Sequence, residues 1–350
     1  MSVKSVLFRE LVKEVPSTTY ATHGLYMYPA KFIPQVVRYV INSYTSPGDW
    51  LFDPFAGYGT VAVEAAITGR NCVLWDLNPM LHLLVSASVY RGPLTLKDLY
   101  VDFSYPEPFH PRWSNITYWH PREFYEVLSR AWGYWHNEVE DRLKPLVAVP
   151  LLKVTRYFSF SDEKIAKLYR SKHAEEKVQR LLGTSWKPKM AEMYWDYAKE
   201  VVDKVSEYQR YGPKPVEIIV KASDERVFTG RYAVVDSMTE RLDRDIDVLV
   251  TSPPYLQAQE YIRSFKLELA WLGFSGSFIS NLSAHEIPYK EVREGYISSR
   301  TYEALKREVE RLNHDKLLKL YVSYFNSLAM FLNNNHKRVR KAIAFFVGPV

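Results

Sequence analysis

Two short loops of the 350-residue sequence carry residues whose types and spacing suit a ligand-binding site. The first loop is "DPFAGYGT" over residues 53–60, with Gly57 and Gly59 in an expected strand-to-helix turn. Glycine lets the backbone approach a ligand closely, and the helix N-terminus behind it favours a negatively charged group. The dinucleotide pattern G-x-G-x-x-G is not met, because residue 62 is alanine, so this turn alone is a weak signal.

The second loop lies in "DVLVTSPPYL" over residues 247–256. The apolar first half is typical of a buried strand, which must end at Pro253 and Pro254 because neither has an N–H group for a sheet. The Ser252 hydroxyl and the Pro253 carbonyl can accept protons from an exocyclic –NH₂ group, while the ring of Tyr255 offers a stacking surface. The loop therefore suits a planar substrate with an amino group, although a bare "PPY" is more often a simple turn.

A carboxylate follows the next expected strand. Asp76, in "LWDLNP", lies about 20 residues beyond the glycine turn, where a carboxylate usually accepts hydrogen bonds from the ribose hydroxyls of a cofactor. The alternative is a helix N-cap before Pro79. The two roles are compatible, and the spacing favours the ribose role.

These loops need a scaffold, and the alternation of strands and helices up to residue 90 predicts a parallel sheet with crossover helices. Expected helices cover residues 34–44, 56–70 and 80–90, and a further helix is expected within residues 1–22. Expected strands cover residues 50–55, 71–79, 216–223, 231–238, 245–255 and 341–350. Long helical patterns such as 121–143 and 191–210 indicate a large, mainly helical insertion over residues 91–215. Because ligands of open α/β sheets bind at the carboxyl ends of the strands, both loops and Asp76 are expected at one edge.

With both loops in place, the sequence resembles the amino-methyltransferases that use S-adenosylmethionine to methylate exocyclic nitrogens of nucleic-acid bases. "TSPPY" resembles the catalytic motif of the cytosine-N4 members, whereas adenine-N6 members more often carry an acidic or amide residue before the prolines. "DPFAGYGT" resembles the cofactor motif, and "HGLYMYPAKFIP" over residues 23–34 resembles the segment that precedes it. The resemblance covers residues 23–90 and 231–271. It implies an α/β, Rossmann-like class I methyltransferase fold with a mostly parallel sheet.

The resemblance also implies a set of site residues. Those expected to bind the cofactor are Asp53, Phe55, Ala56, Gly57, Gly59, Thr60, Asp76, Asn78, Asp236, His23, Pro29 and Lys31. Those expected to receive the target base are Ser252, Pro253, Pro254 and Tyr255. Tyr58 departs from the family, in which a small residue is commoner at this position.

The insertion is a candidate for target recognition, because inserts between the two motifs often have this role in the family. Its basic and aromatic stretch is the expected nucleic-acid contact, with Arg156, Tyr157, Phe158, Lys164, Lys167, Tyr169, Arg170 and Lys172. An ordinary amphipathic helix with a charged face is the equally weighted alternative. The expected division is therefore an N-terminal methyltransferase part (1–90), the insertion (91–215) and a C-terminal methyltransferase part (216–350).

Composition excludes several other classes. A net charge of +6 and a pI near 9.0 favour a polyanionic partner, and 15% of the residues are aromatic. Cys72 is the sole cysteine and falls in an expected buried strand, which argues against an internal disulfide and against a cysteine-dependent methylation of a base carbon. The sequence shows no convincing metal-ligand cluster and no apolar run of membrane-spanning length. A cytoplasmic protein is expected.

The leading hypothesis is a methyl transfer from S-adenosylmethionine to the N4 amine of cytosine in DNA, with the base flipped into the site. RNA cytidine, for example in ribosomal RNA, is the close alternative. Adenine-N6 specificity and a catalytically inactive nucleic-acid-binding scaffold are less favoured. The family's sheet usually continues as a hairpin beyond a strand such as 341–350, and the sequence leaves open how the sheet is completed here.

Overall fold

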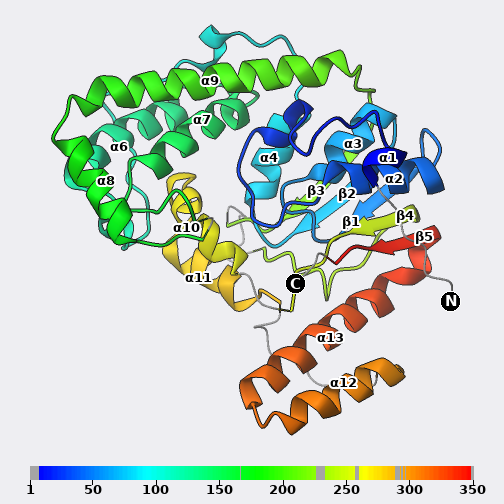
Figure 1. Cartoon of the computed structure of the whole chain (residues 1–350). Coiled ribbons are helices and arrows are strands. Elements are labelled where there is room, and N and C mark those ends of the chain that lie inside the picture. Colours follow the sequence, from blue (N-terminus) through cyan, green and yellow to red (C-terminus); the bar gives the residue numbers. More distant parts are fainter. Residues whose placement is uncertain are drawn as a thin grey trace.

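The computed structural model describes residues 8–165, 167–225, 233–256, 260–287, 292, 295 and 297–347. Its centre is a parallel five-stranded sheet with the order β3-β2-β1-β4-β5 (Figure 1). The strands are β1 (Trp50–Asp53), β2 (Asn71–Asp76), β3 (Ile218–Ala222), β4 (Ile246–Thr251) and β5 (Val339–Phe345). The chain runs outward from β1 to β3 on one side and from β4 to β5 on the other. The switch point between β1 and β4 is where such a sheet binds ligands.

Helices cover both faces of the sheet, which explains why its strands are nearly continuous apolar runs. On one face pack α2 (Pro34–Tyr44), α3 (Thr60–Thr68) and α4 (Met80–Ser88), with Val37, Val61 and Leu81 in the shared core. The opposite face is covered by α13 (Asp315–Asn335), whose Phe331 contacts Phe52 of β1. The sheet edge that carries the loops is therefore fixed from both sides.

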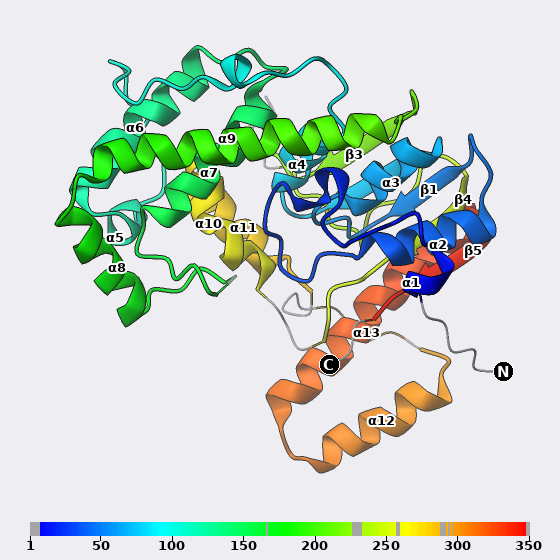
Figure 2. The same cartoon turned by 45° about the horizontal axis from the view of Figure 1, so that its top comes forward.

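A helical lobe stands beside the sheet (Figures 1 and 2). It comprises η2 (Leu96–Leu99), α5 (Ile116–Trp119), α6 (Arg122–Asn137), α7 (Lys144–Tyr157), α8 (Lys172–Leu182), α9 (Trp186–Arg210), α10 (Tyr261–Trp271) and α11 (Gly276–Ala284). One aromatic core joins them, in which Trp132 of α6 stacks on Trp271 of α10 at 6.0 Å between ring centroids. The lobe thus contains α10 and α11, which follow the Ser-Pro-Pro loop after β4, in addition to the expected insertion.

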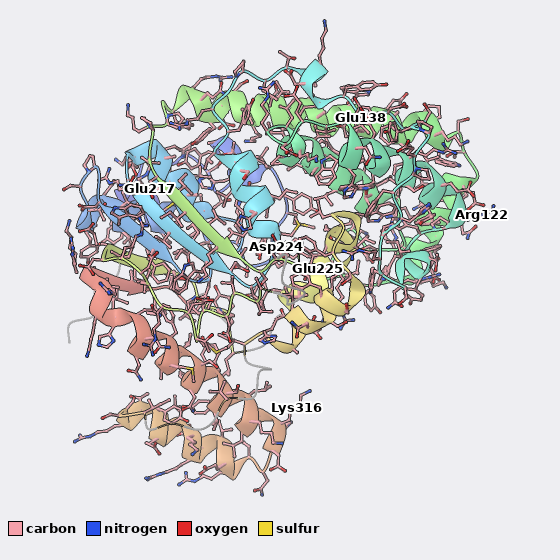
Figure 3. The ribbon with its side chains drawn as sticks, turned by 180° about the vertical axis from the view of Figure 1, so that it is seen from behind. Arg122, Glu138, Glu217, Asp224, Glu225 and Lys316 are labelled. Atoms are coloured by element: carbon pink, nitrogen blue, oxygen red, sulfur yellow. The ribbon has the colours of Figure 1, made fainter. Side chains whose placement is uncertain are left out.

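The lobe is tied to the sheet by polar contacts at the β3 end. The carboxylate of Glu225 accepts a hydrogen bond from Ser275 N at 2.7 Å and lies 3.3 Å from a guanidinium nitrogen of Arg112. Figure 3 shows Glu225 beside the base of α11, while Arg122 and Glu138 lie on the lobe's outer surface.

A second projection is formed by α12 (Arg300–Arg311) and α13. Its outer end extends away from the body, and Lys316 marks the turn between the two helices (Figures 1 and 3). Short elements complete the chain, namely α1 (Phe8–Leu11), η1 (Ala21–Gly24) and η3 (His336–Arg338). None of the described helices combines the length and apolar character needed to cross a membrane.

Most of the expected elements are confirmed, with three corrections. Residues 233–238 do not form a strand: Ala233 makes only an isolated antiparallel bridge with Asp224, and the remainder is a loop that leads into the site. Within residues 8–22 the expected helix is reduced to the four residues of α1, followed by turns. The helix expected over 121–143 ends at Asn137.

Candidate active site

A cavity opens at the carboxyl ends of the strands, beside the β1–β4 switch point. The lining residues come from four parts of the chain, namely the segment before α2, the loops after β1 and β2, the loops around β4, and the α10–α11 region. They are Tyr28, Pro29, Ala30, Lys31, Phe32, Phe55, Ala56, Gly57, Tyr58, Asp76, Leu77, Asn78, Val235, Asp236, Ser237, Met238, Ser252, Pro254, Tyr261, Ile262, His285, Glu286 and Ile287.

The glycine turn between β1 and α3 forms the floor of the cavity. Gly59 has φ +88°, and an added Cβ would lie 2.4 Å from Cγ2 of Val85, so a side chain would be both strained and overpacked there. Gly57 has φ +52°, and a Cβ would approach the ring of Tyr28 to 3.0 Å. The turn therefore requires glycine for its backbone conformation and for the close packing of Tyr28 and α4 around it.

Asp76 connects this turn to the end of β2. Its two carboxylate oxygens accept hydrogen bonds from the backbone N–H groups of Gly57 and Asn78, both at 2.7 Å. Burial raises the pKa of Asp76 to about 6, so the carboxylate is largely ionised at neutral pH. The side-chain amide nitrogen of Asn78, 1% exposed, lies near the Tyr28 side chain but makes no well-formed hydrogen bond within the described part of the chain. A buried donor without a well-formed hydrogen bond, together with a carboxylate on one cavity wall, suits a polar ligand with hydroxyl groups.

Asp53 and Thr60, which were expected to line the cofactor site, are not in the cavity wall and instead support it. Asp53 is buried and accepts hydrogen bonds from Thr251 Oγ1 at 2.6 Å and from Phe55 N at 3.1 Å. The Thr60 hydroxyl donates to the backbone oxygen of Phe32 at 3.0 Å. Both contacts fix the loops whose other residues reach the ligand space.

His23 is also absent from the cavity wall. Its side chain is buried in a polar network with Glu64 and Arg38. Its Nε2 lies 2.8 Å from Glu64 Oε1, and Arg38 Nε donates to Glu64 Oε2 at 2.8 Å. The ammonium group of Lys31 donates to the His23 backbone oxygen. His23 therefore anchors the segment from which Pro29 and Lys31 reach the cavity.

The Ser-Pro-Pro loop after β4 places two of its four expected residues in the cavity. Ser252 and Pro254 line it, whereas Pro253 is buried and Tyr255 is half-buried with its hydroxyl 3.4 Å from Ser252 Oγ. On the facing loop Asp236 lines the cavity, and its Oδ1 accepts a hydrogen bond from Met238 N at 3.1 Å.

Motif reasoning missed a wall of the cavity that comes from Tyr28, Tyr261 and Glu286. Tyr28 lies inside the "HGLYMYPAKFIP" motif, so the motif itself was the signal for it. Tyr261 and Glu286 carry no comparable signal, because they follow the catalytic motif in the α10–α11 region. Burial raises the pKa of Glu286 to about 7, and Glu286 Oε1 accepts a hydrogen bond from Ile262 N at 2.9 Å.

Arg156, an expected nucleic-acid contact, is instead held in an ion pair, with 12% of its side chain exposed. Its Nη1 lies 2.7 Å from Glu268 Oε1 and donates to the Ser264 backbone oxygen at 2.9 Å. The Tyr26 hydroxyl donates to the same Glu268 oxygen at 2.9 Å. This group links α7 of the lobe, α10 and the segment before α2, which is a structural role.

The other residues of that stretch are divided between packing and surface. Phe158 is buried, Tyr157 lies beneath the ammonium groups of Lys177 and Lys189, and the Arg170 guanidinium packs over Phe160 at 4.0 Å. Lys167 is paired with Glu260, whereas Lys164, Tyr169 and Lys172 are exposed. The described residues of this stretch also form no continuous amphipathic helix, since 158–165 and 167–171 belong to neither α7 nor α8.

The fold is of the Rossmann-like class I methyltransferase type, with a parallel sheet, a glycine turn after β1, a carboxylate after β2 and a Ser-Pro-Pro loop after β4. Residues 9–85 match the N6_N4_Mtase family model, described as DNA methylase, so this part of the chain is similar to the cytosine-N4 and adenine-N6 methyltransferases. Enzymes of this family use S-adenosylmethionine as the methyl donor.

Three curated relatives agree with this assignment. Type II methyltransferase M.BsoBI of Geobacillus stearothermophilus is 22% identical over 345 residues, covering 87% of this chain and 64% of that protein. M.MvaI of Kocuria varians is 25% identical over 282 residues, covering 73% and 58%. M.MjaII of Methanocaldococcus jannaschii is 32% identical over 94 residues, covering 27% and 18%. The chain thus spans less than two thirds of the length of each, and no solved structure matches it.

Proposed function

We propose that this chain transfers a methyl group from S-adenosylmethionine to the exocyclic N4 amine of cytosine in DNA. The observation that carries the proposal is that Ser252, at the head of "SPPY", lines the same cavity as Asp76 and Asp236. A neutral hydroxyl before the two prolines favours cytosine over adenine, and the type II relatives favour DNA over RNA.

The cavity residues fit the cofactor. Asp76 and the side-chain amide of Asn78 would bind the ribose hydroxyls, while the turn at Gly57 gives the ligand close access to the backbone. Asp236 would contact the adenine end of the cofactor. When bound, the cofactor supplies an electrophilic methyl group attached to a sulfonium sulfur.

The Ser-Pro-Pro loop would receive the flipped base. The Ser252 hydroxyl and the carbonyl group of Pro253 accept hydrogen bonds from the amine, which orients its nitrogen lone pair. Tyr255, half-buried beside Ser252, offers its ring to the base. The rate gain comes mostly from this orientation, together with carbonyl oxygens near the positive charge that develops on the nitrogen.

Transfer of a labelled methyl group tests the proposal. The protein is incubated with labelled S-adenosylmethionine and either unmethylated genomic DNA or structured RNA, with Ser252→Ala and Asp76→Ala as loss-of-function variants. Label in DNA that depends on both residues supports the proposal. Label in RNA alone would move the substrate to RNA, and cofactor binding without transfer to either would favour the scaffold alternative.

A further inference from the structure

We propose that Glu286 is a further catalytic residue, whose carboxylate accepts the proton that the target amine releases during methyl transfer. The role presupposes the proposed cytosine-N4 transfer and adds a residue that lies outside both motifs. Glu286 follows α11, and the α10–α11 region brings it to the cavity that also contains Ser252 and Pro254.

The position of Glu286 is fixed by α10. Ile262 N donates to Glu286 Oε1 at 2.9 Å, the N–H of Tyr261 also faces the carboxyl group, and the residue is 6% exposed. The Tyr261 side chain is within electrostatic reach of Glu286, Tyr255 and Asp76. The carboxyl group thus belongs to the part of the cavity that lies between the Ser-Pro-Pro loop and the end of β2.

Asp76 and Asp236 are the other carboxylates that line the described part of the cavity, and the resemblance assigns both to the cofactor. Both oxygens of Asp76 accept backbone N–H groups, and Oδ1 of Asp236 accepts the N–H of Met238. The residue before the two prolines is Ser252, whose hydroxyl is a very weak base at neutral pH. Glu286 also accepts backbone N–H groups, but it lies in the α10–α11 wall and is not among the residues expected to bind the cofactor, so it is the cavity carboxylate that we assign to the proton.

The surroundings of Glu286 hold its pKa near neutral pH. Burial raises its pKa to about 7, the backbone N–H groups of Ile262 and Tyr261 oppose this rise, the charge of Glu260 adds to it, and Lys266 opposes it. Tyr28 and Tyr261 face it as neutral phenols, since burial raises the pKa of each hydroxyl above its ordinary value. The neighbouring His285 is hydrogen-bonded through Nδ1 to the Asn281 backbone oxygen at 2.9 Å. A carboxyl group with this pKa is ionised above pH 7 and can accept a proton there.

The proposed step is a substitution at the methyl carbon followed by a proton transfer. The lone pair of the amine nitrogen forms a bond to the methyl carbon while the carbon–sulfur bond breaks, and the sulfur keeps that electron pair. The nitrogen becomes positively charged, and one N–H bond then breaks as its proton passes to the Glu286 carboxylate. The electron pair of that bond neutralises the nitrogen, and Glu286 later releases the proton to solvent.

Glu286→Gln tests this role with single-turnover transfer to DNA measured from pH 5.5 to 9. In the wild type the rate is expected to rise through about pH 7, and in the variant to be lower by about 100-fold without that rise. Calorimetry of S-adenosylmethionine binding is expected to give equal affinities. Glu310→Gln, on the exposed α12, is the control and is expected to retain the wild-type rate.

A second readout does not depend on activity. If the buried carboxyl group titrates near pH 7, the stability of the wild type falls as the pH rises toward 7, and Glu286→Gln reduces this fall in urea unfolding. An unchanged rate and pH profile in Glu286→Gln would overturn the inference while leaving the proposed function intact. Weakened cofactor binding with a normal rate at saturation would assign Glu286 to the cofactor instead. Absence of transfer by the wild type would overturn both proposals.

Discussion

The hydroxyl of Thr251 donates a hydrogen bond of 2.6 Å to the carboxylate of Asp53, and this contact joins the carboxyl ends of β4 and β1. Shortly after each of these residues the chain enters the cavity, through Ser252 on one side and Phe55 on the other. This buried polar pair adds to the backbone pairing of β1 with β4 at the switch point and helps to hold the two cavity loops in their relative position.

The same pair predicts how stability depends on pH. Burial raises the pKa of Asp53 from 3.8 to about 7, so the folded state binds a proton more tightly than the unfolded state between these values. Stability therefore falls as pH rises through this window, by at most about 1.4 kcal/mol per pH unit from this group. Asp53→Asn is expected to reduce the fall, which urea unfolding from pH 4 to 8 measures. An unchanged pH dependence would contradict the assigned burial.

The glycine turn predicts a difference between two matched substitutions. Gly59 and Gly48 have nearly equal φ angles, +88° and +91°, but a Cβ at Gly48 meets nothing within 4 Å. Gly48→Ala is expected to lower the free energy of unfolding by about 1–2 kcal/mol through backbone strain alone. Gly59→Ala adds a clash with Val85 and is expected to cost about 1–3 kcal/mol more. Equal losses in urea unfolding would show that the packing of α4 against the turn is not tight.

Arg156 is predicted to matter for folding rather than for DNA contact. Arg156→Ala would leave Glu268, 1% exposed, with an unpaired buried charge, which costs about 3–5 kcal/mol. Arg122→Ala, in the exposed pair with Glu126, is expected to cause no measurable loss. A normally stable Arg156→Ala variant with weakened DNA binding would restore the nucleic-acid role.

Asp76 is predicted to set the affinity for S-adenosylmethionine. Asp76→Asn keeps the size of the side chain but removes the charge, and it is expected to weaken cofactor binding by about tenfold to a hundredfold. Asp141→Asn is the control, since that side chain is 96% exposed on the lobe. Calorimetry measures both, and equal affinities would place the cofactor elsewhere.

How far the sequence predicts this molecule depends on the range of the interactions involved. Asp76, Ser252 and Pro254 were predictable because strand ends, prolines and glycines act locally and parallel strands bring their ends together. Glu286 was not, because its place depends on the packing of α10 and α11 in the lobe.

The roles of Arg156 and of residues 233–238 also could not be predicted from the sequence. A basic side chain in an aromatic stretch suggests an exposed contact, but its partner Glu268 lies 112 positions away and only the fold shows the pair. Apolar residues over 231–238 suggest a strand, but their described part packs against the sheet as a loop, with Val235 in the core beside Phe331.

Identification of the modified nucleoside tests the central claim most directly. Unmethylated DNA is treated with the protein and S-adenosylmethionine, digested to nucleosides and analysed by mass spectrometry. The site predicts N4-methylcytosine, absent from the products of Ser252→Ala and Asp76→Ala. N6-methyladenine in place of N4-methylcytosine would contradict the specificity assigned to Ser252.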